Sequence, residues 1–483
     1  MEQRDFDAIV VGSGPNGLSA AITLQQQGLR VLVLEAKDTI GGGLRTAELT
    51  LPGFLHDVCS AIHPLAATSP FFQSLPLTDF GLEYLYPAIA AAHPFDDGHA
   101  AVLSSNMPET LATLGADADA YQSLLEPFIE SWPQIVNDAL GPFHFPAHPL
   151  KMAAFGLKAL QPVTTLVKRF NGAYVKGLLG GMAAHATQPL ENMATSAIAL
   201  VLSVVGHRHG WPLPKGGSQQ IAGALAAYFT SLGGKIETNN YVRNLRQLPS
   251  HHALLLDVTP KQFLELAGHK ISGIYKWQLE KYRYGMGVFK IDWALSEAVP
   301  FTAAACRQAG TVHIGNTLEE MAASEVLSHR GVHADKPFVL LAQQSIADSS
   351  RAPAGQHTAW AYCHVPHGSE KDMTDAIEQQ VERFAPGFRD TILARHTFNA
   401  QALQAYNPNY IGGDIGGGIM DARQLYTRPA IKLNPYSTPA KGIYFCSSST
   451  PPGGGVHGMC GYHAARKALK DIFGIRVSLG TPA

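Results

Sequence analysis

The stretch DAIVVGSGPNGLSAAITL, residues 7–24, decides the fold of this chain. It opens with a short apolar run, Asp7 to Val11, which predicts a buried strand. A glycine-rich turn follows at residues 12–17, and apolar residues then recur at helical spacing until Gly28, which we expect to end the helix. Val31 to Leu34 predicts a second buried strand. Strand, helix and strand together make a complete βαβ unit.

The glycines of the turn have separate roles in a dinucleotide-binding unit. Gly12 permits the tight turn, Gly14 lets a pyrophosphate approach the backbone, and Gly17 lets the helix pack closely on the strand. The helix N-terminus adds free N–H groups and a partial positive charge. Glu35 closes the second strand, where a carboxylate accepts hydrogen bonds from a ribose and disfavours a 2′-phosphate. The predicted dinucleotide contacts in this part of the chain are Gly12, Ser13, Gly14, Pro15, Asn16, Gly17, Glu35, Ala36 and Lys37.

A second glycine cluster, Gly41-Gly42-Gly43, follows soon after the ribose acid. FAD extends further than NAD on its ring side and needs another stretch of bare backbone to lie against. The cluster therefore favours FAD over NAD, and a simple glycine turn after a strand is the alternative interpretation.

Composition limits the class of protein. The chain has 483 residues, 46% of them hydrophobic and 15% charged, which predicts a globular protein of two domains. A formal net charge of −2 argues against nucleic acid as a partner. The histidines do not fall into metal-ligand spacings, so no metal site is expected.

Cysteine usage and apolar runs bear on location. The five cysteines are widely spaced and odd in number, so we expect reduced, buried thiols and a cytoplasmic protein. The N-terminus has no signal-peptide pattern. The longest apolar run, near residues 193–205, is too short to span a bilayer.

The second decisive stretch lies near the other end, at Pro451-Pro452-Gly453-Gly454-Gly455. It follows a strand expected at 441–446 and precedes a helix expected from Val456. The prolines fix the approach of the chain, and the glycines remove side chains where a flat ring touches the backbone. The helix N-terminus would then direct N–H groups at the negative charge of a reduced flavin.

The middle of the chain alternates between the two predicted domains. Helical spacing at 221–232 and apolar runs at 235–242 and 253–258 predict a helix and two strands that rejoin the nucleotide fold. Strands are also expected at 288–293 and 358–365, and a helix at 373–384. In the first of these strands Lys290 and Asp292 share a face, which favours a solvent-side ion pair; a polar pair on the substrate side is the alternative.

Two segments carry weaker signals. Lysines interrupt an apolar stretch at 149–170, which predicts either a helix on the core with a solvated face, or contact with a membrane surface or an apolar tunnel. The cluster His207 to Trp211 is a candidate for the wall of a substrate site.

Together the motifs GSGPNG, LEAKDTIGGGLRT and PPGGGVHGM resemble the phytoene desaturase-like branch of the FAD-dependent amine oxidase superfamily. That branch includes carotenoid isomerases, retinol saturases and pyridine nucleotide-disulfide oxidoreductase domain 2 proteins. Its members usually read E-A-x4-G-G-R, whereas this chain has Gly43-Leu44 before Arg45. The resemblance covers both ends of the chain and the segment that returns between them.

The resemblance implies further site residues. The segment 54–64 would run under the flavin ring, with His63 or His56 facing it, unless these are hydrogen-bonded histidines of the core. The strand at Val242 would pair with the adenine edge, and His457 would bond to ribityl or ring oxygens or donate a proton. The implied flavin contacts are Gly42, Gly43, Leu44, Arg45, Ser60, Ala61, Val242, Gly454, Gly455, Val456, His457 and Met459.

The predicted fold is α/β: a Rossmann-like FAD-binding domain with a second substrate domain of mixed sheet and helices. The FAD-binding domain is expected to be discontinuous, at residues 1–75, 213–264 and 401–483. The substrate domain is expected at 76–212 and 265–400.

The implied activity is that of an FAD-dependent oxidoreductase acting on C–H or C=C bonds of a lipophilic substrate. It would be of desaturase, saturase or isomerase type, with hydride transfer at flavin N5 and with oxygen or a quinone as electron acceptor. A flavin amine oxidase on the same fold is one alternative, and a flavin-binding protein that acts through partners without catalysis is another. The expected location is cytoplasmic, with contact to a membrane surface.

Overall fold

The structure, a computed structural model, describes residues 4–479 of the chain. One of its two main sheets has five parallel strands in the order β16-β10-β1-β2-β9. The strands come from well-separated parts of the chain: β1 (Ala8–Val11), β2 (Val31–Leu34), β9 (Lys235–Glu237), β10 (Ala253–Leu256) and β16 (Ile443–Phe445). The central strands are apolar throughout because helices cover both faces of the sheet.

Alternate residues of β1 belong to different cores. Ala8 and Val10 pack with the helices of one face, and Ile9 and Val11 with those of the other. The first face is covered by α1 (Pro15–Gln25), α10 (Gln219–Ser231) and α17 (Met459–Ala468), and the second by α11 (Pro260–Ala267) and α12 (Gly273–Glu280). The βαβ unit, the helix after residue 218 and the Rossmann-like α/β fold are thereby confirmed.

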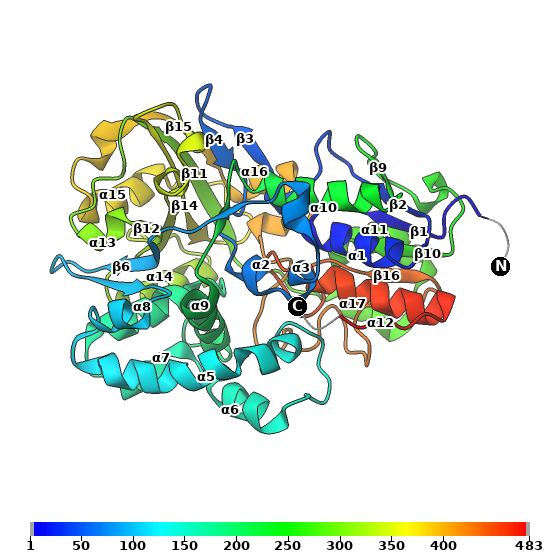
Figure 1. Cartoon of the computed structure of the whole chain (residues 1–483), viewed down its shortest axis with the longest axis horizontal. Coiled ribbons are helices and arrows are strands. Elements are labelled where there is room, and N and C mark those ends of the chain that lie inside the picture. The colour runs from blue at the N-terminus through cyan, green and yellow to red at the C-terminus, as the bar shows by residue number, and fades with distance from the viewer. Residues whose placement is uncertain (1–3, 480–483) are drawn as a thin grey trace.

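Helix α17 lies directly along α1, so the last part of the chain packs on the first (Figure 1). The approach is so close that a Cβ at Gly461 would overlap the carbonyl oxygen of Asn16. A Cβ at Gly458 would likewise overlap the hydroxyl of Ser19. Glycine at position 461 lets the two backbones meet, and glycine at position 458 makes room for side chains of α1 and α3 (Pro70–Gln73).

The second sheet has seven strands in the order β15-β11-β14-β13-β12-β6-β7. β6 and β12 are parallel, and the other neighbours are antiparallel. Both predicted substrate-side segments contribute to this sheet. Its strands are β6 (Ile89–Pro94), β7 (Ala100–Leu103), β11 (Gly287–Leu295), β12 (Ala309–Ile314), β13 (Val339–Ala342), β14 (His357–Val365) and β15 (Ile392–Phe398).

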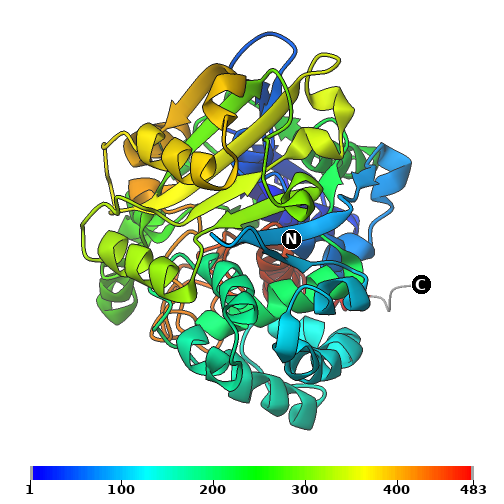
Figure 2. The same ribbon diagram turned by 90° about the vertical axis from the view of Figure 1, so that its left-hand side faces the viewer.

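Helices cover this sheet and form a layer beside it (Figure 2). α15 (Thr374–Phe384) packs on one face, and α8 (Ala173–Ala184) and α14 (Leu318–His329) pack on the other. The other helices are α2 (Pro64–Thr68), α3 (Pro70–Gln73), α4 (Met107–Leu111), α5 (Ala118–Ala139), α6 (Pro149–Ala159), α7 (Val163–Leu166), α9 (Thr195–His209), α13 (Ala304–Arg307) and α16 (Ala400–Tyr406). Within residues 4–479, no helix has both the length and the apolar character needed to cross a bilayer.

Two short sheets complete the fold. β3 (Thr46–Glu48) and β4 (Leu55–Asp57) form a hairpin that projects from the nucleotide fold toward the seven-stranded sheet. β5 (Tyr84–Leu85) pairs with β8 (Leu213–Pro214) where the chain leaves and re-enters the nucleotide fold.

Three local expectations are wrong. The strand expected at 235–242 ends at Glu237, and the helix expected from Val456 begins only at Met459. The pair Lys290–Asp292 does not face solvent, because all residues of β11 are buried and His56 of the β3–β4 hairpin lies 3.7 Å from Asp292. The domain boundaries stay a prediction, and residues 1–3 and 480–483 of the outer segments lie outside the described range.

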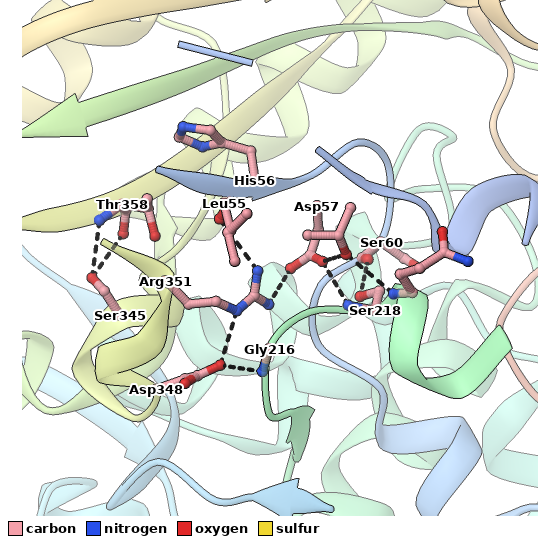
Figure 3. Close-up of polar contacts among 12 residues, drawn as sticks. Leu55, His56, Asp57, Ser60, Gly216, Ser218, Ser345, Asp348, Arg351 and Thr358 are labelled. Carbon is pink, nitrogen blue, oxygen red and sulfur yellow. Dashed lines mark hydrogen bonds and ion pairs between the residues drawn. The ribbon is translucent and has the colours of Figure 1, made fainter. Parts of the chain in front are cut away.

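A buried charge cluster around Arg351 connects the nucleotide fold to the seven-stranded sheet (Figure 3). Its guanidinium contacts Asp57 at 2.6 Å and Asp348 at 3.0 Å, and all three side chains are essentially inaccessible to solvent. Asp348 accepts a hydrogen bond from the Gly216 N–H, and Asp57 accepts one from the Ser218 N–H. The cluster therefore ties the β3–β4 hairpin and the start of α10 to the turn that follows β13.

The contact between α1 and α17 predicts the effect of a side chain at position 461. Gly461→Val should destabilise the protein by about 3 kcal/mol, because backbone blocks the space that the new side chain needs. Gly223→Ala, on an exposed face of α10 with open space around it, is the matched control and should leave stability unchanged or slightly raised. Thermal unfolding followed by circular dichroism measures both, and equal midpoints would contradict the close contact.

The Arg351 cluster predicts a pH-dependent loss. Burial alone would raise the pKa of Asp57, but Arg351, the Ser218 N–H and the Thr46 hydroxyl outweigh it and hold that pKa below its usual value. A carboxyl with a lowered pKa stabilises the fold above its unfolded pKa of about 4, and this contribution is lost as the pH falls. Arg351→Met should therefore cost about 3–5 kcal/mol at neutral pH and clearly less near pH 4.

Thermal midpoints of wild type and Arg351→Met at both pH values test this expectation. Arg30→Met, which removes the exposed pair with Asp7, should shift the midpoint little at either pH. A loss in Arg351→Met that is the same at both pH values would mean that lost packing, not an unpaired Asp57, causes it.

Candidate functional site

A cavity of about 790 Å³ opens at the carboxyl ends of the parallel strands. Gly12 follows β1, Glu35 follows β2 and Asp257 follows β10, and all three line it. This edge of an open parallel sheet is where such folds bind their ligands. From there the cavity continues toward the seven-stranded sheet, where Tyr362 of β14 lines it.

Most of the predicted cofactor contacts come together in this cavity. Its lining includes Gly12, Ser13, Gly14, Pro15, Asn16, Glu35, Ala36, Lys37, Gly42, Gly43, Arg45, Ser60, Val242, Gly454, Gly455 and Val456. Gly17, Leu44, Ala61 and Met459 are not part of the lining. Leu44, Ala61 and Met459 are core residues, each almost fully buried, and Gly17 is the last residue of the glycine-rich turn. That any of these residues binds a cofactor stays a prediction.

The glycine segments build a cradle of bare backbone. A Cβ at Gly42 would lie 3.0 Å from the Cα of Gly14, so the first two glycine clusters are in contact. A Cβ at Gly454 would lie 3.1 Å from the Cα of the neighbouring Gly416. Side chains at these positions would collide with that backbone, so glycine lets these segments meet and leaves bare backbone along the cavity, which fits a long dinucleotide.

The Glu35 carboxylate is already fully hydrogen-bonded. One oxygen accepts from the N–H and the hydroxyl of Ser13, at 3.0 and 2.5 Å, and the other from the Lys37 N–H and the Arg45 guanidinium, at 2.9 and 3.0 Å. A carboxylate has about four acceptor positions, so a ribose hydroxyl must displace one donor. The Ser13 hydroxyl can rotate away most easily. Arg45 reaches the cavity edge despite the Leu44 that precedes it.

Asp257 was missed as a site residue. Its carboxylate accepts a hydrogen bond from the Gly17 N–H at 3.0 Å, one of the N–H groups expected to face phosphate. Burial raises the pKa of Asp257 to about 7, and the nearby Glu35 adds to the rise while the Gly17 N–H opposes it. The signal was available in the sequence, because Asp257 ends an apolar strand as Glu35 does.

His63 lines the cavity and has a defined tautomer. Its Nε2 lies 2.8 Å from the Ser218 hydroxyl, which lies 2.7 Å from the carbonyl oxygen of Ser60. Both bonds form only if Ser218 donates to the carbonyl and His63 donates through Nε2. Nδ1 is then an acceptor, and it is buried without a partner. Burial lowers the pKa of His63 to about 4, so the ring is neutral at physiological pH.

The other two candidate catalytic histidines do not line the cavity. His56 projects from the hairpin on the side opposite Asp57, with Nε2 2.8 Å from the Thr50 hydroxyl and Nδ1 3.7 Å from Asp292 (Figure 3). Successive residues of a strand point to opposite faces, which explains this direction. His457 lies 3.2 Å from the Gly453 carbonyl through Nε2 and accepts from the Met459 N–H through Nδ1.

Direct catalytic roles for His56 and His457 stay predictions. His457 accepts the first N–H of α17, and this helix begins at Met459 rather than directly after the glycines. The predicted substrate-wall cluster at 207–211 is also outside the lining: His207 bonds to the Tyr121 hydroxyl and the Ser104 carbonyl in the core.

The part of the cavity lined by α9 and its neighbours is mostly aliphatic. Its side chains come from the segment after the hairpin, from α9 and from the loop before β16: Ile62, Leu65, Ile198, Val201, Leu202 and Met420. His185, Thr187 and Tyr362 are the polar side chains among them. Sequence patterns missed these residues because they meet only when α8, α9 and β14 are brought together.

The comparisons with known proteins agree with this arrangement. Residues 10–75 match the family described as NAD(P)-binding Rossmann-like domain. The chain is 25% identical to pyridine nucleotide-disulfide oxidoreductase domain-containing protein 2 of Rattus norvegicus, over 97% of this chain and 94% of the relative. It is 22% identical to a lycopene-forming phytoene desaturase of Paracoccus sp., over 94% and 95%.

Solved structures share the fold. An oxidoreductase from Methanosarcina mazei superposes with a TM-score of 0.65 at 14% identity, covering 96% of this chain and all of that one. Cyclohexylamine oxidase from Brevibacterium oxydans superposes with a TM-score of 0.60 at 16% identity, covering 97% and 98%. The recognition made from the sequence is thereby confirmed: over nearly its whole length, this chain has homologues among pyridine nucleotide-disulfide oxidoreductase domain 2 proteins and phytoene desaturases, and it shares the fold of solved amine oxidases.

Proposed function

We propose that the chain is an FAD-dependent oxidoreductase that acts on a C–H or C=C bond of a lipophilic substrate, as a desaturase, saturase or isomerase. The observation that carries this proposal is a single cavity with two unlike ends. One end is a glycine cradle at the edge of a parallel sheet, and the other is a largely aliphatic chamber. A redox cofactor and an apolar substrate would therefore meet inside one enclosed space.

The charged residues of the lining also differ between the two ends of the cavity. The basic residues of the lining are Lys37, Arg45 and Arg243, and they belong to the nucleotide end, where they suit phosphates. The acidic residues of the lining, Glu35, Asp257 and Glu265, lie at that end too. Among residues 4–479, no carboxylate lines the aliphatic end to pair with an ammonium group. This favours a neutral substrate over the cationic amine of the alternative, an amine oxidase on the same fold.

FAD, when bound, would supply two-electron redox chemistry, accepting or delivering the electron pair of a C–H bond. The glycine segments at 12–17 and 41–43 would hold its phosphates and approach its ring side. Aliphatic walls would keep water from the reacting carbon. His63 would present a neutral acceptor nitrogen, held in place through Ser218 by the Asp57–Arg351 cluster.

The first test is cofactor content. The purified chain should be yellow and release one FAD per chain, identified by mass and by its absorption spectrum. Gly14→Val should bind FAD at least about tenfold more weakly, because its side chain enters the place of the pyrophosphate. Gly223→Ala, away from the cavity, should keep the cofactor.

A colourless wild-type chain with no affinity for FAD would disprove the proposal. A flavin that binds but is never reduced or reoxidised with any lipophilic compound would favour the remaining alternative, a flavin-holding protein without catalysis. Reduction by amines, with release of peroxide, would favour the amine oxidase.

We also propose that the chain contacts a membrane surface through α6 and the loop before it. Phe145, Leu150 and Leu157 expose 85%, 87% and 72% of their surface. The two leucines are seven residues apart and share a face of the helix, with Lys151 and Lys158 beside them. Exposed apolar side chains with neighbouring lysines are what an interfacial helix needs. Such a surface would also give an apolar substrate a route from lipid.

Vesicle binding tests this contact. The wild type should co-sediment with vesicles of phosphatidylcholine and phosphatidylglycerol, and the double variant Leu150→Ser/Leu157→Ser should bind several-fold less, since it loses buried apolar surface. Leu393→Ser removes an exposed apolar side chain from β15, which lies away from α6 (Figure 1), and should bind as the wild type does. Equal binding by all three proteins would contradict the assignment of this surface.

A further inference from the structure

His185, at the end of α8, is a polar group that the proposed redox chemistry does not use. It lines the aliphatic end of the cavity together with Ile198 and Val201. Its Nε2 lies 2.9 Å from Nε2 of His313 on β12, and its Nδ1 has no hydrogen bond within residues 4–479. Burial lowers the pKa of His185 to about 3 and that of His313 also well below its usual value. Both rings are therefore neutral, and one hydrogen lies between them.

The surroundings of His313 decide which ring holds that hydrogen. His313 is fully buried, and its Nδ1 has no partner. This nitrogen lies against Gly181 of α8, since a Cβ there would be 2.7 Å from it. Another imidazole close enough to affect the charge of His313, that of His93, donates through Nε2 to the Asn316 carbonyl and makes no bond to His313. A hydrogen on Nδ1 of His313 would thus be a buried donor with no acceptor, which proteins rarely tolerate.

The tautomer with no hydrogen on Nδ1 of His313 fits better, because the lone pair of that nitrogen makes a weak favourable contact with the Cα–H groups of Gly181. His313 then carries its hydrogen on Nε2 and donates it to His185. His185 must carry its own hydrogen on Nδ1, the nitrogen that is free of protein partners. The imidazole pair therefore presents an N–H donor at the wall of a largely aliphatic chamber.

We propose that the lipophilic substrate of this chain carries an oxygen acceptor, a carbonyl or ether oxygen, that accepts a hydrogen bond from His185 Nδ1. A pure hydrocarbon would leave this buried donor unpaired. The inference rests on the proposed function, since it names the class of substrate for the same chamber. A second donor is available nearby in the lining: the Tyr362 hydroxyl also makes no hydrogen bond within the described residues. Burial raises its pKa, so it keeps its proton.

Limonene and carvone make a matched pair of probes, because they share a skeleton and carvone adds one carbonyl. Headspace gas chromatography measures how much of each the purified protein, with its native cofactor content, removes from the vapour. His185→Phe should weaken carvone binding by about fivefold to tenfold and leave limonene binding within about twofold. His185→Asn, whose amide nitrogen can replace Nδ1–H, should restore most of the carvone affinity.

Val201→Ala is the control for a change of shape, and it should alter the affinity for both probes by a similar factor. The infrared band of the carvone carbonyl gives a readout that needs no variant: it should lie lower in the wild-type complex than in an alkane solvent. Equal effects of His185→Phe on both probes, an unshifted carbonyl band, or no binding of either probe to flavin-loaded protein would each overturn this inference. Absence of FAD from the purified chain would instead refute the proposed function itself.

Discussion

The contact between α1 and α17 is the constraint on which the rest of the structure depends. Because the backbone of Asn16 touches Gly461, the first glycine turn and the last glycine segment lie in one place, although most of the chain separates them. The cradle at Gly14, Gly42 and Gly454 exists only while these helices stay together. A side chain at position 461 would separate them, and the cavity would lose one wall.

Sequence patterns predicted the parts of the fold whose signals are local. The βαβ unit and α10 follow from period and glycine placement within a few turns of chain, and so does the cluster of backbone at 41–43. Directions of side chains were not predictable in this way. His56 and His63 looked equivalent, yet only His63 reaches the cavity. His56 lies on β4 and points to Asp292 of the large sheet, whereas His63 follows the hairpin and contacts Ser218. The hairpin thereby covers the face of β11 that carries Lys290 and Asp292, a long-range contact that alternation alone does not reveal.

At the aliphatic end of the cavity, the polar side chains are neutral rather than charged. Ionisable groups near that end are held in their neutral forms, since burial lowers the pKa of His63 and His185 and raises that of Tyr362. The ion pairs Asp57–Arg351 and Lys290–Asp292 lie outside the cavity lining. They stabilise the β3–β4 hairpin and the seven-stranded sheet. Neutral hydrogen-bond donors and acceptors can then select a ligand through the geometry of its hydrogen bonds, and no charged group has to lose its hydration.

The order of strands in the parallel sheet has a consequence for synthesis of the chain. β16 pairs with β10 but is made only at residues 443–445, so one edge of β10 has no strand partner while the 186 residues between Leu256 and Ile443 are synthesised. An unpaired apolar edge is a template for association with other chains. We therefore expect an incomplete chain to associate more readily than the finished protein.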